Sequence, residues 1–222
     1  QAGYPKEQCF HLALGTSLTI IILTSLSAAK THYTKGNLIL RVSLICGFMG
    51  IAGSFAASLT AVNLSDSLLK KAFAVMLIVA GIQMLTKKNP PNPSESEMNL
   101  ETWRLGIIGL GSGILAGFFG IGGGLIGVPL FVLWSKMGQH KAVGSSSGMV
   151  IILAVFGALG YALSKPPIPM DYSFGYINFP ACLMVAATSI VFASIGARLA
   201  AKVNARVLTI IFVCVAGLIA LK

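Results

Sequence analysis

GILAGFFGIGGGLIGVPLF, residues 113–131, is the stretch of sequence that decides the fold. It lies within Leu105–Trp134, a segment of thirty residues without a charge, ten of which are glycine. Each glycine in a helix costs up to about 1 kcal/mol relative to alanine, so one continuous helix would be poor. The run GIGGG at 120–124, followed by Pro129, predicts a break between two helical arms. We therefore expect a Gly-rich broken helix, in the form of a helical hairpin.

The first arm of this hairpin carries a stripe of small residues. Gly109, Gly113 and Gly117 recur at four-residue spacing, which places them on one face of a helix. A stripe of this kind lets a second helix approach closely. We interpret it as a packing surface and not as a binding site.

The rest of the chain is also apolar: 55% of its 222 residues are hydrophobic, only 10% are charged, and the mean hydropathy is +0.85. A helix needs roughly 20 apolar residues to span a bilayer. Four runs have this length with Arg41 as their single charged residue, and two more begin near basic residues that can reach the headgroups. The six runs are His11–Ala29, Asn37–Thr60, Ala142–Leu163, Phe174–Ala197, Ser67–Thr86 and Ala205–Leu221. We predict an all-α, polytopic transmembrane protein.

One hydrophilic segment, KKNPPNPSESEMNLETW at 87–103, divides the chain. We expect a first transmembrane repeat at 1–86, a linker at 87–104 and a second repeat at 105–222. ALGTS at 13–17 aligns with AVGSS at 142–146, and Gly36 then falls opposite Gly175. Weak internal symmetry of this kind is typical of secondary transporters, although any two glycine-rich apolar helices align somewhere.

The distribution of basic residues depends on how Leu105–Trp134 crosses the membrane. A single crossing divides them about evenly between the two sides, whereas a hairpin that returns to its own side places most of them on one face. The second arrangement obeys the positive-inside rule and gives the two halves opposite orientations. We expect inverted repeats on this basis.

Two places can leave donors free for an anion. The glycines at 120–124 expose backbone N–H groups at a helix start, where the positive end of the helix dipole also points. The second place is GSSSG at 144–148, with its counterpart Gly15, Thr16 and Ser17 in the first half. Hydroxyls at the start of a span can donate to an oxyanion or can merely cap the helix.

Several kinds of chemistry are not supported by the residues present. The predicted spans contain no Asp or Glu, and Asp66 and Asp171 belong to connecting loops, so we expect a uniporter without a carboxylate proton relay. No cluster of ligands suggests a metal, a cofactor or an enzyme. The net charge of +10 comes from short basic segments between apolar runs, which predicts contact with lipid headgroups and not with nucleic acid. His11, His140 and Lys141 could attract anions or could anchor span ends at the interface.

With these motifs assembled, the sequence resembles the sulfite exporter TauE/SafE family of membrane transporters. The resemblance rests on residues 113–131, on HKAVGSSSG at 140–148 and on HLALGTSL at 11–18. Family members carry the signature twice, whereas the first copy of the glycine hairpin is absent here. Because the chain opens on Gln1, we expect residues upstream to complete the substrate site.

The resemblance implies a transporter in a bacterial inner membrane for the export or uptake of sulfite or a small organosulfonate, with export as the favoured direction; the sequence alone supports only a small oxyanion. The implied substrate-binding residues come from the helix break and from the two hydroxyl-bearing helix starts. They are Gly120, Gly122, Gly123, Gly124, Ser145, Ser146, Thr16 and Ser17. An anion channel, or a scaffold protein whose glycines serve only packing, are the alternatives.

Overall fold

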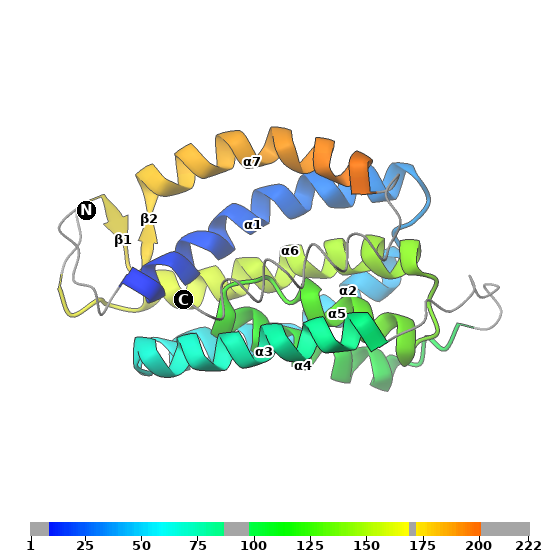
Figure 1. The fold of residues 1–222 in the computed structure, drawn as a ribbon, viewed down its shortest axis with the longest axis horizontal. Helices are drawn as coiled ribbons and strands as arrows, with labels where there is room; N and C mark the ends of the chain where they lie inside the picture. Colours follow the sequence, from blue (N-terminus) through cyan, green and yellow to red (C-terminus); the bar gives the residue numbers. More distant parts are fainter. Residues whose placement is uncertain (1–8, 87–97, 169–171, 201–222) are drawn as a thin grey trace.

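The computed structural model describes residues 9–86, 98–168 and 172–200. Within these ranges the chain is almost entirely helical, as predicted. Seven helices and one two-stranded hairpin follow in this order: α1 (Cys9–Thr34), α2 (Leu40–Ala61), α3 (Asp66–Thr86), α4 (Thr102–Phe119), α5 (Gly124–Leu133), α6 (Gln139–Leu163), β1 (Ser173–Phe174), β2 (Ile177–Asn178) and α7 (Phe179–Ala200). Figure 1 shows the helices lying roughly along the long axis of the molecule.

Four of the helices, α1, α2, α4 and α6, are long and apolar enough to cross a membrane. The spans predicted at 11–29, 37–60, 67–86 and 142–163 agree with helices to within a few residues, apart from an extra turn at the end of α1. The span expected from Phe174 begins instead at Phe179, because Gly175 adopts a φ of +58° in the turn of the β1–β2 hairpin. The span predicted at 205–221 lies outside the described residues.

The helix order in space places α2 and α6 at the centre. α2 packs against both α4 and α6, α6 packs against α1, and α1 packs against α7. Buried apolar side chains from these helices, including Leu18, Ile108, Met149 and Leu153, form the core. α1 runs antiparallel to α6, since Gly15 lies beside Tyr161 and Leu18 lies beside Gly157.

The glycine-rich segment is a hairpin, as the sequence predicts. α4 ends at Phe119, the chain reverses through residues 120–123, and α5 returns along α4. The guanidinium of Arg104 lies 3.5 Å from the carbonyl oxygen of Trp134, and the Asn99 N–H donates to the Ser135 carbonyl at 3.0 Å. The segment therefore enters and leaves at the same end of the bundle.

The stripe of glycines on α4 packs against α2, also as predicted. A Cβ added at Gly109, Gly113 or Gly117 would collide with the carbonyl oxygen of Cys46, Gly50 or Ser54 respectively. These three carbonyls follow one another along α2, so the two backbones are in contact over two turns. Small residues at this seam allow the close approach that drives helix association in lipid.

The two ends of the bundle differ in charge. The hairpin-base end, which contains Asn37, Arg104 and Trp134, carries six of the basic side chains in the described part of the chain: Lys30, Lys35, Arg41, Arg104, Lys136 and Lys141. The opposite end, which we call the pocket end and which contains His11, Asp66 and Tyr176, carries three in the same ranges: Lys70, Lys71 and Lys165. The larger group of basic side chains therefore lies at the end of the bundle where the α4–α5 hairpin begins and ends.

Candidate functional site

The break between α4 and α5 is built from glycines in the left-handed region of the backbone. Gly120 caps α4 with a φ of +63°, Gly122 has a φ of +69°, and Gly123 caps the start of α5 with a φ of +76°. Residues with a Cβ rarely adopt this conformation, which explains why the sequence here is almost pure glycine. The break at 120–124 predicted from the sequence is confirmed.

The start of α5 has donors without helical acceptors. The Gly127 N–H donates to the Gly123 carbonyl at 3.0 Å and is the first hydrogen bond of the helix. The N–H groups of Gly124, Leu125 and Ile126 therefore have no acceptor within α5. The positive end of the helix dipole reinforces the same spot. Such a start favours a negative charge.

This helix start lies halfway along the bundle. A Cβ at Gly122 would come within 2.8 Å of Val150 on α6 and 3.0 Å of Ile21 on α1, and a Cβ at Gly123 would collide with the Ser112 carbonyl on α4. Each of these neighbours lies near the middle of its own helix. Because α1, α4 and α6 are long enough to span the membrane, the broken helix starts near mid-membrane.

Two serine hydroxyls converge on the first turn of α5. The Cβ position at Gly127 lies 3.4 Å from Ser112 Oγ and 3.5 Å from Ser146 Oγ, and that at Gly124 lies 3.4 Å from Ser146 Oγ. Ser112 is fully buried, and its Oγ has no hydrogen-bond partner in the described part of the chain. A buried hydroxyl without a partner costs about 1–3 kcal/mol, so its retention calls for an explanation.

Ser17 holds the break from the side of α1. Its Oγ donates to the Gly120 carbonyl oxygen at 3.0 Å, which fixes the first residue of the turn against α1. Ser17 therefore positions the glycine loop through a hydrogen bond of its own.

The structure places Thr16 and Ser145 away from the break. Ser145 Oγ accepts from the Ile39 N–H at the start of α2, and Thr16 Oγ1 accepts from the Asn178 N–H just before α7, both at 3.1 Å. These hydroxyls satisfy the backbone where a helix begins. Of the eight residues predicted for the site, the six brought together are Gly120, Gly122, Gly123, Gly124, Ser17 and Ser146.

Ser112 was missing from the set predicted from the sequence. A signal for it existed, because it is the single hydroxyl-bearing residue among the thirty residues Leu105–Trp134. The glycines on either side of it drew attention to packing instead. Within the described ranges, no group of three or more His, Cys, Asp or Glu side chains could hold a metal ion.

Comparison with known proteins agrees with this architecture. The chain is 29% identical over 210 residues to a probable membrane transporter protein from Methanocaldococcus jannaschii, covering 94% of this chain and 77% of that protein. It is 37% identical over 157 residues to the probable membrane transporter protein YdhB from Bacillus subtilis, covering 68% of this chain and 63% of that protein. A probable membrane transporter protein from Haemophilus influenzae is 29% identical over 201 residues, covering 89% of this chain and 75% of that protein. No solved structure matches the chain.

These relatives and the apolar helices make the chain an integral membrane protein and a transporter, and the bacterial inner membrane is consistent with its family. The family model described as "Sulfite exporter TauE/SafE" matches residues 9–222, which include every helix described above. The chain therefore belongs to the sulfite exporter TauE/SafE family of membrane transporters.

Proposed function

We propose that this transporter carries a small oxyanion, and that it exports sulfite or a small organosulfonate. The observation that carries the proposal is the buried Ser112 hydroxyl, which has no described partner and lies beside Ser146 at the start of the half-length helix α5. Transporters of several folds bind anionic groups at the N-termini of broken helices near the membrane midplane.

The donors at this place suit an oxyanion with several oxygens. Three backbone N–H groups and two hydroxyls can each donate one hydrogen bond, and the helix dipole contributes positive potential without a fixed charge. A site without a fixed charge binds an anion weakly enough to release it on the other side. Among the small oxyanions, sulfite is the one that the family's description names.

The orientation in the membrane follows from the charge at the two ends. The hairpin-base end, with six described basic side chains, is the cytoplasmic one under the positive-inside rule, and the pocket end faces outward. Export would then move the anion from the hairpin-base end to the pocket end.

The two-repeat arrangement is part of this proposal and is supported by reciprocal contacts. Thr16 on α1 accepts from the N–H before α7, and its predicted counterpart Ser145 on α6 accepts from the N–H before α2, at the same distance of 3.1 Å. In the same register, Gly15 lies against the Tyr176 carbonyl and Gly144 lies against the Asn37 carbonyl. Contacts that recur in both directions are what a two-fold relation between halves produces.

This relation makes Ser17 and Ser146 counterparts. Both lie at the break between α4 and α5, Ser17 on the carbonyl of Gly120 and Ser146 beside the first turn of α5. The repeats would therefore place one of these serines on each side of the break, from α1 and from α6. α1 and α6, which carry these hydroxyls, run in opposite directions, as inverted repeats require.

Thermal stability of the purified full chain in detergent tests the proposed function. A ligand that binds only the folded state stabilises it by about 2.7 kcal/mol at 100 times its dissociation constant. We expect sulfite or methanesulfonate to raise the melting temperature and chloride or acetate, at equal ionic strength, to leave it unchanged. An identical response to all four anions would contradict the proposal.

The Ser112→Ala variant separates binding from packing. It removes a buried hydroxyl without a described partner, so the protein without anion should be as stable as the wild type or up to about 1 kcal/mol more stable. The anion, however, loses one donor, and its affinity should fall about tenfold. Melting curves across a sulfite titration give both quantities.

Ser54→Ala is the matched control. Ser54 is as buried as Ser112, but its Oγ donates to the Leu153 carbonyl at 2.7 Å. This variant should lose stability by about 1 kcal/mol and keep its anion affinity. If Ser112→Ala behaves like Ser54→Ala, the Ser112 hydroxyl does not bind the anion.

A further inference from the structure

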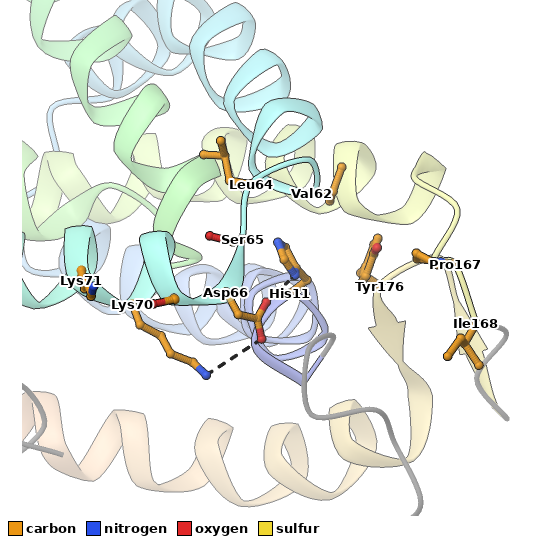
Figure 2. A pocket seen from close by; sticks show the side chains of 11 residues that line it. His11, Val62, Leu64, Ser65, Asp66, Lys70, Lys71, Pro167, Ile168 and Tyr176 are labelled. Carbon is orange, nitrogen blue, oxygen red and sulfur yellow. Dashed lines mark ion pairs between the residues drawn. The ribbon is translucent and has the colours of Figure 1, made fainter.

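A second polar cluster lies at the pocket end, far along α1 from the start of α5. A cavity of about 860 Å³ opens there between the starts of α1 and α3 and the β1–β2 turn. Its polar lining includes His11, Asp66, Lys70, Lys71 and Tyr176, and Figure 2 shows the His11 ring directed at the Asp66 carboxylate. The sequence had placed Asp66 in a loop, whereas it is the first residue of α3 and its side chain is only 11% exposed.

Both ring nitrogens of His11 face an oxygen. Nδ1 lies 2.7 Å from Asp66 Oδ1, and Nε2 lies 3.0 Å from the carbonyl oxygen of Ala61. His11 itself is 4% exposed. Apart from His11 and Lys70, neither carboxylate oxygen of Asp66 has a polar partner in the described part of the chain. The carboxylate therefore depends on His11 for most of its stabilisation.

The geometry of the pair suits the binding of a proton. A carbonyl oxygen only accepts, so Nε2 carries a hydrogen and donates it to Ala61. Nδ1 faces Asp66 Oδ1 at 2.7 Å, and this contact is attractive only when a proton is bound by one of the two groups. A proton shared by this pair strengthens the contact between the first turn of α1 and the start of α3.

The surroundings favour the charged form of this pair. Ala61 is the last residue of α2, where the dipole favours a cation, and Asp66 is the first residue of α3, where it favours an anion. Lys70 Nζ lies 3.9 Å from Asp66 Oδ2, and Lys71 lines the same cavity. Burial, and secondarily the Asp66 carboxylate, raise the pKa of Tyr176, so this phenol stays neutral near pH 7. Proton exchange with the cavity then falls to His11 and Asp66.

We propose that His11 and Asp66 form a proton-binding site that couples anion transport to the movement of a proton. The inference rests on the proposed transport function and adds its coupling ion. It replaces the uniporter expected from the sequence, because a carboxylate is present where the first helix and the third meet.

α1 connects the proton site to the anion site. Ser17, which donates to the Gly120 carbonyl at the break, follows His11 by six residues on the same helix, a rise of about 9 Å. Loss of the proton weakens the contact between the first turn of α1 and the start of α3. The protonation of His11 and Asp66 therefore acts on the same helix that holds the anion site through Ser17.

Accumulation of anion at steady state in proteoliposomes tests the coupling. The full chain is reconstituted with a pH difference of one unit and with the membrane potential held at zero by potassium and valinomycin. Labelled methanesulfonate, whose charge is constant over this pH range, and labelled sulfite are the probes. One coupled proton sustains about a tenfold concentration ratio of methanesulfonate across the membrane, with a sign that distinguishes symport from antiport.

Substitutions at His11 and Asp66 test whether these two residues form the proton-binding site. His11→Gln and Asp66→Asn keep the size of the side chain, and each should reduce the concentration ratio from tenfold to one while flux continues. Glu101→Gln is the matched control, because Glu101 is an exposed carboxylate at the hairpin-base end and binds Arg104 at 2.8 Å. This control should keep the tenfold ratio.

Each outcome decides a separate claim. If the wild type transports either probe but its steady-state concentration ratio across the membrane stays at one, the coupling is overturned. The proposed transport function is not affected by this result. A tenfold ratio that persists in both His11→Gln and Asp66→Asn overturns the assignment to this pair. If the wild type transports neither probe faster than protein-free liposomes do, the proposed function is overturned, and this inference with it.

Discussion

Gly123→Ala is expected to weaken anion binding by roughly 10- to 100-fold and to reduce transport in proportion. Gly123 has a φ of +76°, and a Cβ there would collide with the backbone carbonyl of Ser112. A residue with a Cβ in this conformation costs about 1–3 kcal/mol, and the collision forces the start of α5 away from α4. The N–H groups at 124–126 and the Ser112 hydroxyl then no longer converge. Sulfite titration of the melting temperature, with flux measured in parallel, checks this result.

Gly36→Ala is the control for backbone strain. Gly36 has a φ of +69° in the turn between α1 and α2, and a Cβ there meets nothing within 4 Å. The two variants share the strain of a left-handed alanine, but only Gly123 lies at the break. Gly36→Ala should therefore melt at a lower temperature and bind anion normally. Equal anion affinities in the two variants would contradict a binding role for the start of α5.

Gly113→Ala is expected to destabilise the protein by about 1–3 kcal/mol, the usual cost of overpacking. A Cβ at Gly113 would collide with the backbone carbonyl of Gly50 on α2, and a backbone cannot move aside as a flexible side chain can. α2 and α4 must separate, and the contacts at Gly109 and Gly117 are lost with the one at Gly113. Thermal unfolding in detergent measures the loss.

Gly111 lies two residues away on the same helix, and Gly111→Ala should stabilise the protein instead. A Cβ at Gly111 meets nothing within 4 Å, so the variant gains helix propensity, up to about 1 kcal/mol. A Gly113→Ala protein as stable as the Gly111→Ala protein would show that the seam between α2 and α4 is not closely packed.

Much of the fold follows from the sequence because lipid constrains it strongly. A spanning segment must satisfy its backbone internally, so apolar runs such as 142–163 can only be helices. The break at 120–124 was also predictable, because glycine is the residue that adopts a positive φ without strain. The stripe on α4 was predictable from its four-residue spacing, although its partner α2 was not, since the pattern on one helix does not name the helix that it meets.

The candidate site was predictable only in part. The sequence led to Gly120, Gly122, Gly123, Gly124, Ser17 and Ser146, which lie at the break, but also to Thr16 and Ser145, whose hydroxyls accept from the backbone at helix starts. Neighbouring serines on a helix point to different faces, and the sequence alone does not say which face meets the hairpin. Ser112 and the pair of His11 with Asp66 depend on contacts between distant segments, which local patterns do not record.

Counterflow of labelled sulfite tests the central claim most directly. Proteoliposomes that contain the full chain are loaded with unlabelled sulfite and diluted into a trace of labelled sulfite. A transporter with a binding site exchanges one for the other, so the label should rise transiently above its equilibrium level inside, in the wild type and in Gly36→Ala but not in Gly123→Ala. Label that enters in proportion to its concentration without an overshoot, or an overshoot undiminished in Gly123→Ala, would contradict an anion site at the start of α5.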